Sequence, residues 1–293
     1  MKRACILLLA AALGAAPAMQ ASGQGIDLSQ LGNIVQQATN ELAVQINLSG
    51  RQRMLTQKMS KEAMLAALGV EPEKTRRKLK ATMALFERTL LGLMRGDEGQ
   101  HLPPTKDEAI LKQLNRVLAL WKDFKPLVSA VASGLADQAM LEEIAHKNLP
   151  LLREMNKAVK MYERASGADT AELAVVINLS GRQRMLTQKM AKEYLLLALG
   201  IEPKTNRARL QKTMALFDRT LNGLLDGDAE QELPGTKDAA IRAQLQKVMA
   251  LWKQYRPMLK QPPRKADLAA LEAMSLRILA EMNKAVKMYE ESW

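Results

Sequence analysis

A short polar strip is the part of this chain best suited to chemistry, and it occurs twice. Each time, the sequence NLSGRQRM places an asparagine, a glycine and an arginine at intervals of three residues. On a helix, residues at this spacing lie near one another. The planar fork of an arginine suits a planar oxyanion, and a glycine inside a helix costs about 1 kcal/mol, so it indicates close approach of a helix or a ligand. The residues are Asn47, Gly50 and Arg53, and then Asn178, Gly181 and Arg184.

The segment that contains this strip is repeated almost unchanged. Ile46–Gly69 and Ile177–Gly200 begin 131 positions apart and differ at four of 24 positions. Between Val70–Leu127 and Ile201–Met258, only about half of the positions are identical. A constraint on the first segment or a recent duplication with uneven drift would both produce this contrast. Either way, the sequence indicates a tandem duplication of one helical unit.

Matching turn residues divide each copy into four predicted helices. In the first copy, one helix ends at Gly69, the next begins near Pro72 and stops near Gly96, a third ends or kinks before Pro126, and a fourth spans 135–164. The corresponding positions in the second copy are Gly200, Pro203, Gly227, Pro257 and 266–291. Amphipathic helices with short connections pack as bundles. We therefore expect an all-α fold of two tandem antiparallel four-helix bundles.

The first residues, MKRACILLLAAALGAAPAMQASG, have the pattern of a secretory signal peptide. We expect cleavage after Ala18 or Ala21, with an uncleaved anchor as the alternative. Cys5 is the one cysteine, so cleavage would leave a chain without thiols. We therefore expect an exported, periplasmic protein. The expected segments are a signal peptide at 1–21 and helical domains at 22–165 and 166–293.

Charge and composition limit the classes of partner. The formal net charge is +12, or +10 without Lys2 and Arg3, which favours an anionic partner. Nucleic acid is disfavoured, because aromatic residues make up only 3% of the chain and few could stack on bases. We expect no metal or other cofactor, since His101 and His146 have no equivalents in the repeat and methionine at helical spacing usually fills cores. We also expect no enzyme, because no catalytic triad, repeated carboxylate pair or phosphate-binding loop is present.

The motif N-x-x-G-x-x-R-M, continuing into T-Q-K, resembles the P-box of the NarX- and PilJ-like periplasmic sensor domains. In that family, two P-box helices meet across a dimer and one arginine from each holds a single nitrate. Two guanidinium groups about 6 Å apart repel each other by roughly 3 kcal/mol at an effective dielectric near 20, and an anion between them removes that penalty. The resemblance implies the ligand-binding residues Arg53, Arg184, Gly50, Gly181, Asn47 and Asn178.

The resemblance implies an exported sensory protein that binds nitrate or nitrite and acts with a separate membrane sensor or chemoreceptor. The two P-boxes could pair within one chain or across a homodimer, and the sequence leaves both open. The alternative function is a helical scaffold protein of the cell envelope, associated with type IV pili or a chemoreceptor, without a small ligand. The alternative for the two motif arginines is an ion pair with a carboxylate such as Glu41 or Glu172. Arg51 and Arg182 are expected to face solvent.

Overall fold

The computed structural model describes residues 28–167 and 170–292, which form helices joined by turns and short loops. The chain divides into two compact units, Met1–Gln37 and Ala38–Trp293. In the first unit, the described part is the opening of one helix, and the expected signal peptide at 1–21 lies outside the described residues. The second unit contains both copies of the repeat. The expected all-α fold is confirmed.

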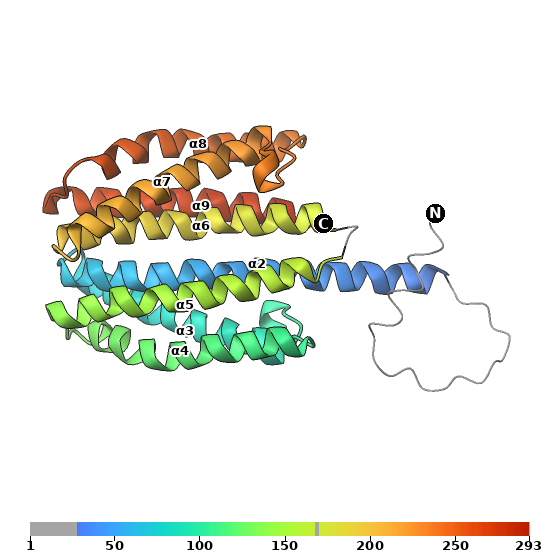
Figure 1. Ribbon diagram of the computed structural model, residues 1–293, viewed down its shortest axis with the longest axis horizontal. Helices are drawn as coiled ribbons and strands as arrows, with labels where there is room; N and C mark the ends of the chain where they lie inside the picture. The colour runs from blue at the N-terminus through green and yellow to red at the C-terminus, as the bar shows by residue number, and fades with distance from the viewer. Residues whose placement is uncertain (1–27, 168–169, 293) are drawn as a thin grey trace. The chain divides into compact units, whose positions relative to one another are not determined.

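Each copy contributes helices in the same order (Figure 1). The first copy forms α2 (Leu28–Ala67), α3 (Pro72–Arg95), α4 (Glu108–Ala132) and α5 (Gln138–Arg164). The second copy forms α6 (Ala171–Ala198), α7 (Pro203–Asp226), α8 (Ala239–Lys260) and α9 (Leu268–Glu291). Three short 3-10 helices lie in the connections, at Glu98–Gln100, Ala229–Gln231 and Lys265–Asp267. No described helix has an apolar stretch long enough to cross a membrane.

Local signals explain most helix boundaries. Pro72 and Pro203 occupy the first turn of α3 and α7, where proline costs no intrahelical hydrogen bond. The backbone N–H of Ile110 donates to Asp107, which caps α4, and Asp238 caps α8 in the same way.

Two helices continue past a proline at which we expected an end or a kink. α4 extends beyond Pro126 to Ala132, and α8 extends beyond Pro257 to Lys260. Both prolines lie on the exposed side of their helices. The carbonyl that each proline leaves without a backbone donor can therefore bond to water, which lowers the usual cost of an interior proline.

Aromatic and aliphatic side chains fill the core of each copy. In the first copy, the rings of Phe86 and Trp121 lie 4.8 Å apart between α3 and α4. In the second copy, Phe217 and Trp252 repeat the contact at 4.7 Å. These large buried rings hold the outer helices of each copy together.

The P-box helices α2 and α6 occupy the centre of the molecule. The side chain of Gln52 on α2 donates to the backbone of α3, and that of Gln57 donates to Asn148 on α5. On its other sides, α2 contacts the second copy through Arg53, which bonds to α6, and Lys61, which bonds to α9. A helix contacted on all sides is buried around its whole circumference. The two copies therefore pack against each other within one chain.

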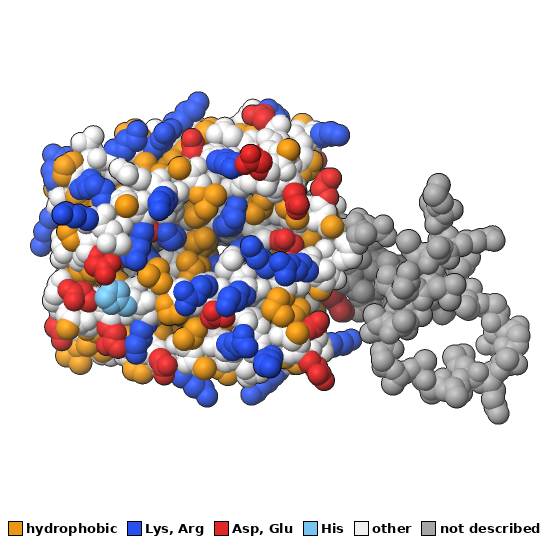
Figure 2. Space-filling model, in the orientation of Figure 1, with side chains coloured by type: hydrophobic (Ala, Val, Ile, Leu, Met, Phe, Trp, Pro, Cys, Tyr) orange, Lys and Arg blue, Asp and Glu red, His pale blue; other side chains and the backbone are white. Residues whose placement is uncertain are grey.

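The surface carries the excess positive charge in a dispersed form. On the face shown in Figure 2, lysine and arginine side chains are spread over both copies, among carboxylates and scattered apolar side chains. Most of these cationic side chains therefore lie on solvated helix faces and do not form one binding patch.

Candidate functional site

The arginine from each P-box helix points toward the other P-box helix. A Cβ placed on Gly50 would lie 3.5 Å from Nη2 of Arg53 and 3.7 Å from Nη2 of Arg184. A Cβ on Gly181 would lie 3.2 Å from Nη2 of Arg184 and 3.9 Å from Nη2 of Arg53. The two Nη2 atoms are thus at most about 7 Å apart, and each lies against both glycines. An added Cβ would be in ordinary contact with the guanidinium groups at Gly50 and in a tighter contact at Gly181.

Neutral oxygens, rather than carboxylates, bond to the two arginines. Arg53 donates from Nη1 to Oδ1 of Asn156 at 2.9 Å and from Nη2 to the backbone oxygen of Asn178 at 3.1 Å. Arg184 donates from Nη2 to Oδ1 and the backbone oxygen of Asn47, at 2.8 and 3.2 Å. Each arginine therefore bonds to the P-box asparagine of the other copy. The structure brings all six sequence-predicted residues together.

Both arginines are buried cations. Arg53 is 1% exposed and Arg184 is 4% exposed. Within the described residues, neither takes part in a salt bridge, so the alternative of a carboxylate-paired arginine is wrong. The Nε atom of each is buried without a hydrogen-bond acceptor.

Burial and neighbouring positive charges lower the pKa of both groups. Burial and the charges of Arg182 and Arg184 lower the pKa of Arg53 to about 9. Burial and the charge of Arg51 lower the pKa of Arg184 to about 10. Both remain protonated at neutral pH, so the site holds two confined positive charges. An uncompensated buried charge is costly, and a bound anion would offset that cost.

Two carboxylates that the sequence analysis did not single out hold the P-box asparagines. Nδ2 of Asn47 donates to Oε2 of Glu290 on α9 at 2.6 Å. Nδ2 of Asn178 donates to Glu163 on α5. Each bond crosses between the copies. Glu163 and Glu290 are the last residues of the repeated segment EMNKAVKMYE, and that repetition was the available signal.

A groove of about 540 Å³ between α2, α3 and α9 reaches one of the two arginines. Arg184 and Asn47 belong to its lining, together with the basic residues Lys58, Lys78 and Lys287. Positive charge along such a groove attracts anions from solution. The groove thus offers an approach to the arginine pair from the surface.

Arg51 and Arg182 do not face solvent as expected. Nη2 of Arg51 donates to Gln100 at 2.7 Å, and Nη2 of Arg182 donates to Gln231 at 3.1 Å. Both side chains are half-buried and tie the P-box helix to the 3-10 turn of the same copy. They are therefore structural, while adding positive charge near the site.

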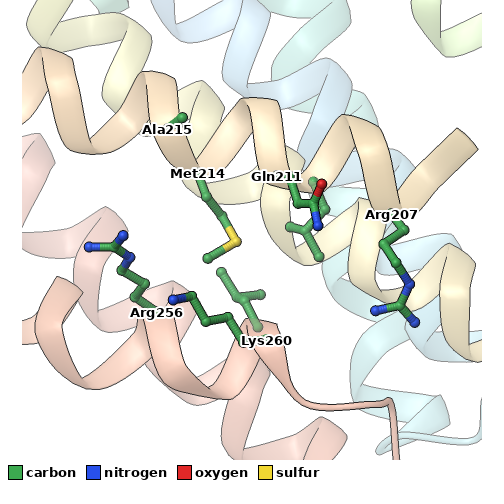
Figure 3. A pocket seen from close by; sticks show the side chains of 8 residues that line it. Arg207, Gln211, Met214, Ala215, Arg256 and Lys260 are labelled. Carbon is green, nitrogen blue, oxygen red and sulfur yellow. The ribbon is translucent and has the colours of Figure 1, made fainter.

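A second hollow, of about 300 Å³, lies between α7 and α8 and is drawn in Figure 3. Arg207, Arg256 and Lys260 lie around its edge, with Met214 between the helices. None of its lining residues comes from α2 or α6. In the first copy, Ser129 occupies the position equivalent to Lys260, and Lys80 occupies the position equivalent to Gln211, so the basic residues are placed differently there. We therefore place the candidate site at the arginine pair.

The described residues contain no group of three or more histidine, cysteine, aspartate or glutamate side chains arranged to hold a metal ion. His146 instead bonds to Glu202 at 2.9 Å on the surface.

Two lysines, both missed by the sequence analysis, are buried farther along the interface between the copies. Lys61 is 0% exposed and forms a salt bridge with Glu272 on α9 at 2.6 Å. Its repeat equivalent, Lys192, is 2% exposed and donates to Oδ1 of Asn148 at 2.9 Å. Ala145 occupies the position equivalent to Glu272, so Lys192 lacks the matching carboxylate.

The burial of Lys192 predicts a pH-dependent stability. Desolvation lowers the pKa of Lys192 from 10.5 to about 7. Above pH 7 the unfolded state binds this proton and the native state does not. The free energy of unfolding should therefore rise with pH, by up to about 1.4 kcal/mol per unit. We expect denaturant unfolding between pH 7 and 8.5 to show this rise in the natural protein and a smaller rise in Lys192→Met. Replacing the exposed Lys212 should leave the rise unchanged, and equal slopes in all three proteins would contradict the assignment.

Comparison with known proteins places this geometry in a family. The family described as "Type IV pili methyl-accepting chemotaxis transducer N-term" matches residues 34–146 and 170–274. The methyl-accepting chemotaxis protein McpN of Pseudomonas aeruginosa is 40% identical over 116 residues, covering 38% of this chain. That match spans only 21% of McpN's own length.

Among solved structures, the ligand-binding domain of the P. aeruginosa nitrate receptor McpN is 39% identical, and the match covers 39% of this chain and 92% of that domain, with a TM-score of 0.35. The family match is the broader finding, since it includes both P-box helices and most of each copy. The chain belongs to the family of type IV pili methyl-accepting chemotaxis transducer N-terminal domains, which it carries in two tandem copies.

Proposed function

We propose that this protein is an exported, non-enzymatic sensory protein that binds one nitrate or nitrite ion between Arg53 and Arg184 of the same chain. The observation that carries the proposal is the pair of buried guanidinium groups, whose hydrogen-bond acceptors among the described residues are neutral oxygens. At a separation of at most about 7 Å and an effective dielectric near 20, their repulsion is at least about 2 kcal/mol. A planar oxyanion between them would remove this repulsion and accept hydrogen bonds from both forks.

Similarity to a receptor for nitrate supports nitrate or nitrite as the ligand. The relative whose ligand-binding domain is 39% identical is titled a nitrate receptor. The P-box glycines support a small ligand, because they leave room beside the helix backbone where any larger residue would contact the guanidinium groups.

The contacts between the P-box helices support pairing within one chain. Arg53 bonds to the backbone of Asn178, and Arg184 bonds to Asn47, so each copy completes the site of the other. A homodimer is then unnecessary for binding. The proposed organisation is a signal peptide at 1–21, followed by domains at 22–165 and 166–293, in a periplasmic protein that reports to a membrane chemoreceptor or sensor.

Calorimetric titration of residues 22–293 with nitrate tests the proposal. We expect saturable binding of one nitrate per chain, while the mass in solution stays that of a monomer. Sodium chloride at the same concentration serves as the control for ionic strength and should produce no saturable heat. One nitrate per two chains, together with a dimer mass, would contradict pairing within the chain. The absence of binding by nitrate and nitrite would contradict the proposed function and favour the scaffold alternative.

A further inference from the structure

Two carboxylates are each linked to the arginine pair through one asparagine residue. Glu290 accepts from Nδ2 of Asn47, and Oδ1 of the same asparagine accepts from Arg184. In the other copy, Glu163 accepts from Nδ2 of Asn178, whose backbone oxygen accepts from Arg53. Glu290 also lines the groove that reaches Arg184. The acidic side chains are thus part of the surroundings of the site while leaving both guanidinium groups unpaired.

Glu290 determines which way the side-chain amide of Asn47 points. An ionised carboxylate can only accept hydrogen bonds, so it holds the NH₂ group of the asparagine. The amide oxygen of Asn47 is thereby directed toward Arg184, at 2.8 Å from Nη2. The glutamate therefore positions the polar wall of the site without touching the arginine.

The carboxylates also limit the positive charge of the site. The arginines of the two motifs, including Arg51 and Arg182, bring four positive charges into a small volume. Glu163 acts electrostatically on Arg53 and Arg182. Glu290 acts in the same way on Arg184 and Arg51.

The charge of the site affects monovalent and divalent anions differently. The cost of removing an ion from water grows with the square of its charge, whereas its attraction to the site grows only in proportion to the charge. Two carboxylates reduce the positive potential of the site. At this lower potential, the attraction still offsets the dehydration cost of a monovalent anion but offsets a smaller fraction of the dehydration cost of a divalent one. Burial raises the pKa of Glu290, while Asn47 and the charge of Arg184 lower it.

We propose that Glu163 and Glu290 are specificity-determining residues that restrict the arginine pair to monovalent oxyanions. This inference rests on the proposed function of the pair. It makes charge, as well as shape, the property by which the site separates nitrate from a divalent anion such as sulfate.

The test is a comparison of nitrate and sulfate binding in the double variant Glu163→Gln, Glu290→Gln. Glutamine has nearly the same shape and keeps an oxygen that can accept from the asparagine, so the substitution removes charge and retains the contact. We expect the ratio of nitrate affinity to sulfate affinity to fall by about tenfold or more, because sulfate gains about twice as much as nitrate from the loss of each negative charge. Calorimetry at constant ionic strength measures both affinities.

The matched control is the double variant Glu154→Gln, Glu281→Gln. These residues lie on the same two helices, nine positions before Glu163 and Glu290, and pair with Lys157 and Lys284 on the surface. The control makes the same change in net charge and should leave the affinity ratio within twofold of the natural protein. Glu290→Gln alone provides a milder variant, for which we expect a smaller fall in the same direction.

The outcomes separate this inference from the function on which it rests. If the natural protein binds nitrate and the ratio does not change in the double or the single variant, the role of the glutamates is wrong and the arginine site stands. If the natural protein binds sulfate as tightly as nitrate, the inference is also wrong. If neither anion binds the natural protein, the proposed function and this inference both fail.

Discussion

Replacing Arg53 or Arg184 with methionine is expected to weaken nitrate binding at least about a hundredfold. Each guanidinium group would donate charge-assisted hydrogen bonds to the anion, worth about 1.5 to 3 kcal/mol each, and supply half of the positive charge that confines it. A loss of about 2.7 kcal/mol corresponds to a hundredfold change in affinity. Calorimetry measures the loss directly, and the nitrate-dependent rise in melting temperature should disappear with it.

Arg53→Met should leave the ligand-free protein as stable as the natural protein, or about 1 to 2 kcal/mol more stable. Arg53 is 1% exposed and has neutral hydrogen-bond partners, so the substitution removes a buried charge that no carboxylate contacts directly and fills the space with an apolar side chain. Denaturant unfolding without nitrate measures this effect. A loss of more than about 2 kcal/mol with unchanged nitrate binding would show that the arginine is a packing residue instead.

Two further variants make the arginine prediction specific. Arg116→Ala removes a positive charge from the exposed face of α4 and should leave nitrate affinity nearly unchanged. The double variant at Arg53 and Arg184 should bind nitrate no worse than either single variant, because an anion that needs both forks is already lost when one is removed. Additive losses would indicate two independent anion sites.

The candidate site residues can be picked out from the sequence because each carries local information. Gly50 lies inside a helical pattern at a cost in stability, and Arg53 follows about one turn later, so the motif is recognisable without the fold. The repeat then doubles the signal. The pairing of the two P-boxes carries no such local signal, since the bond from Arg53 to the backbone of Asn178 joins residues 125 positions apart. The local pattern is the same for pairing within a chain and between chains, so the sequence left both open.

The partners of the P-box were harder to predict than the P-box itself. Glu290 bonds to Asn47 across 243 positions, and nothing in the local pattern of either segment points to the other. From sequence alone, Lys61 and Lys192 would be predicted to face solvent, because lysine is almost always exposed. They are buried because α2 and α6 pack against the other copy. The helical pattern of one copy does not predict this packing between copies.

Helix caps illustrate the same limit on a smaller scale. Thr105 and Glu108 have the spacing of a capping box at the start of α4. In the structure, Thr105 instead donates to the backbone oxygen of Leu93, and Asp107 caps the helix. The local pattern assigns the threonine to the helix cap, but its hydroxyl instead forms a tertiary hydrogen bond to the preceding helix.

The salt bridge between Lys61 and Glu272 predicts a large loss of stability when its acidic member is removed. Glu272→Ala should lower the free energy of unfolding by about 3 to 5 kcal/mol, because it leaves the charge of Lys61 buried without its partner. Lys61 is 0% exposed, and the pair joins α2 of the first copy to α9 of the second at 2.6 Å. Denaturant unfolding at neutral pH measures the loss. Glu291→Ala, which removes the exposed ion pair with Lys287 from the same helix, should cost less than about 1 kcal/mol.

The double variant Lys61→Met, Glu272→Met separates the need for a partner from the need for charge. With both charges removed and apolar side chains in their place, we expect stability near that of the natural protein, because the cost of burying two ions disappears along with their attraction. The coupling energy of the cycle should then be large and specific to this pair. If Glu272→Ala alone costs less than 1 kcal/mol, Lys61 has found another acceptor, for which the neighbouring Glu62 is the candidate. In that case the salt bridge does not hold the copies together, and the pairing of α2 with α9 depends on apolar packing alone.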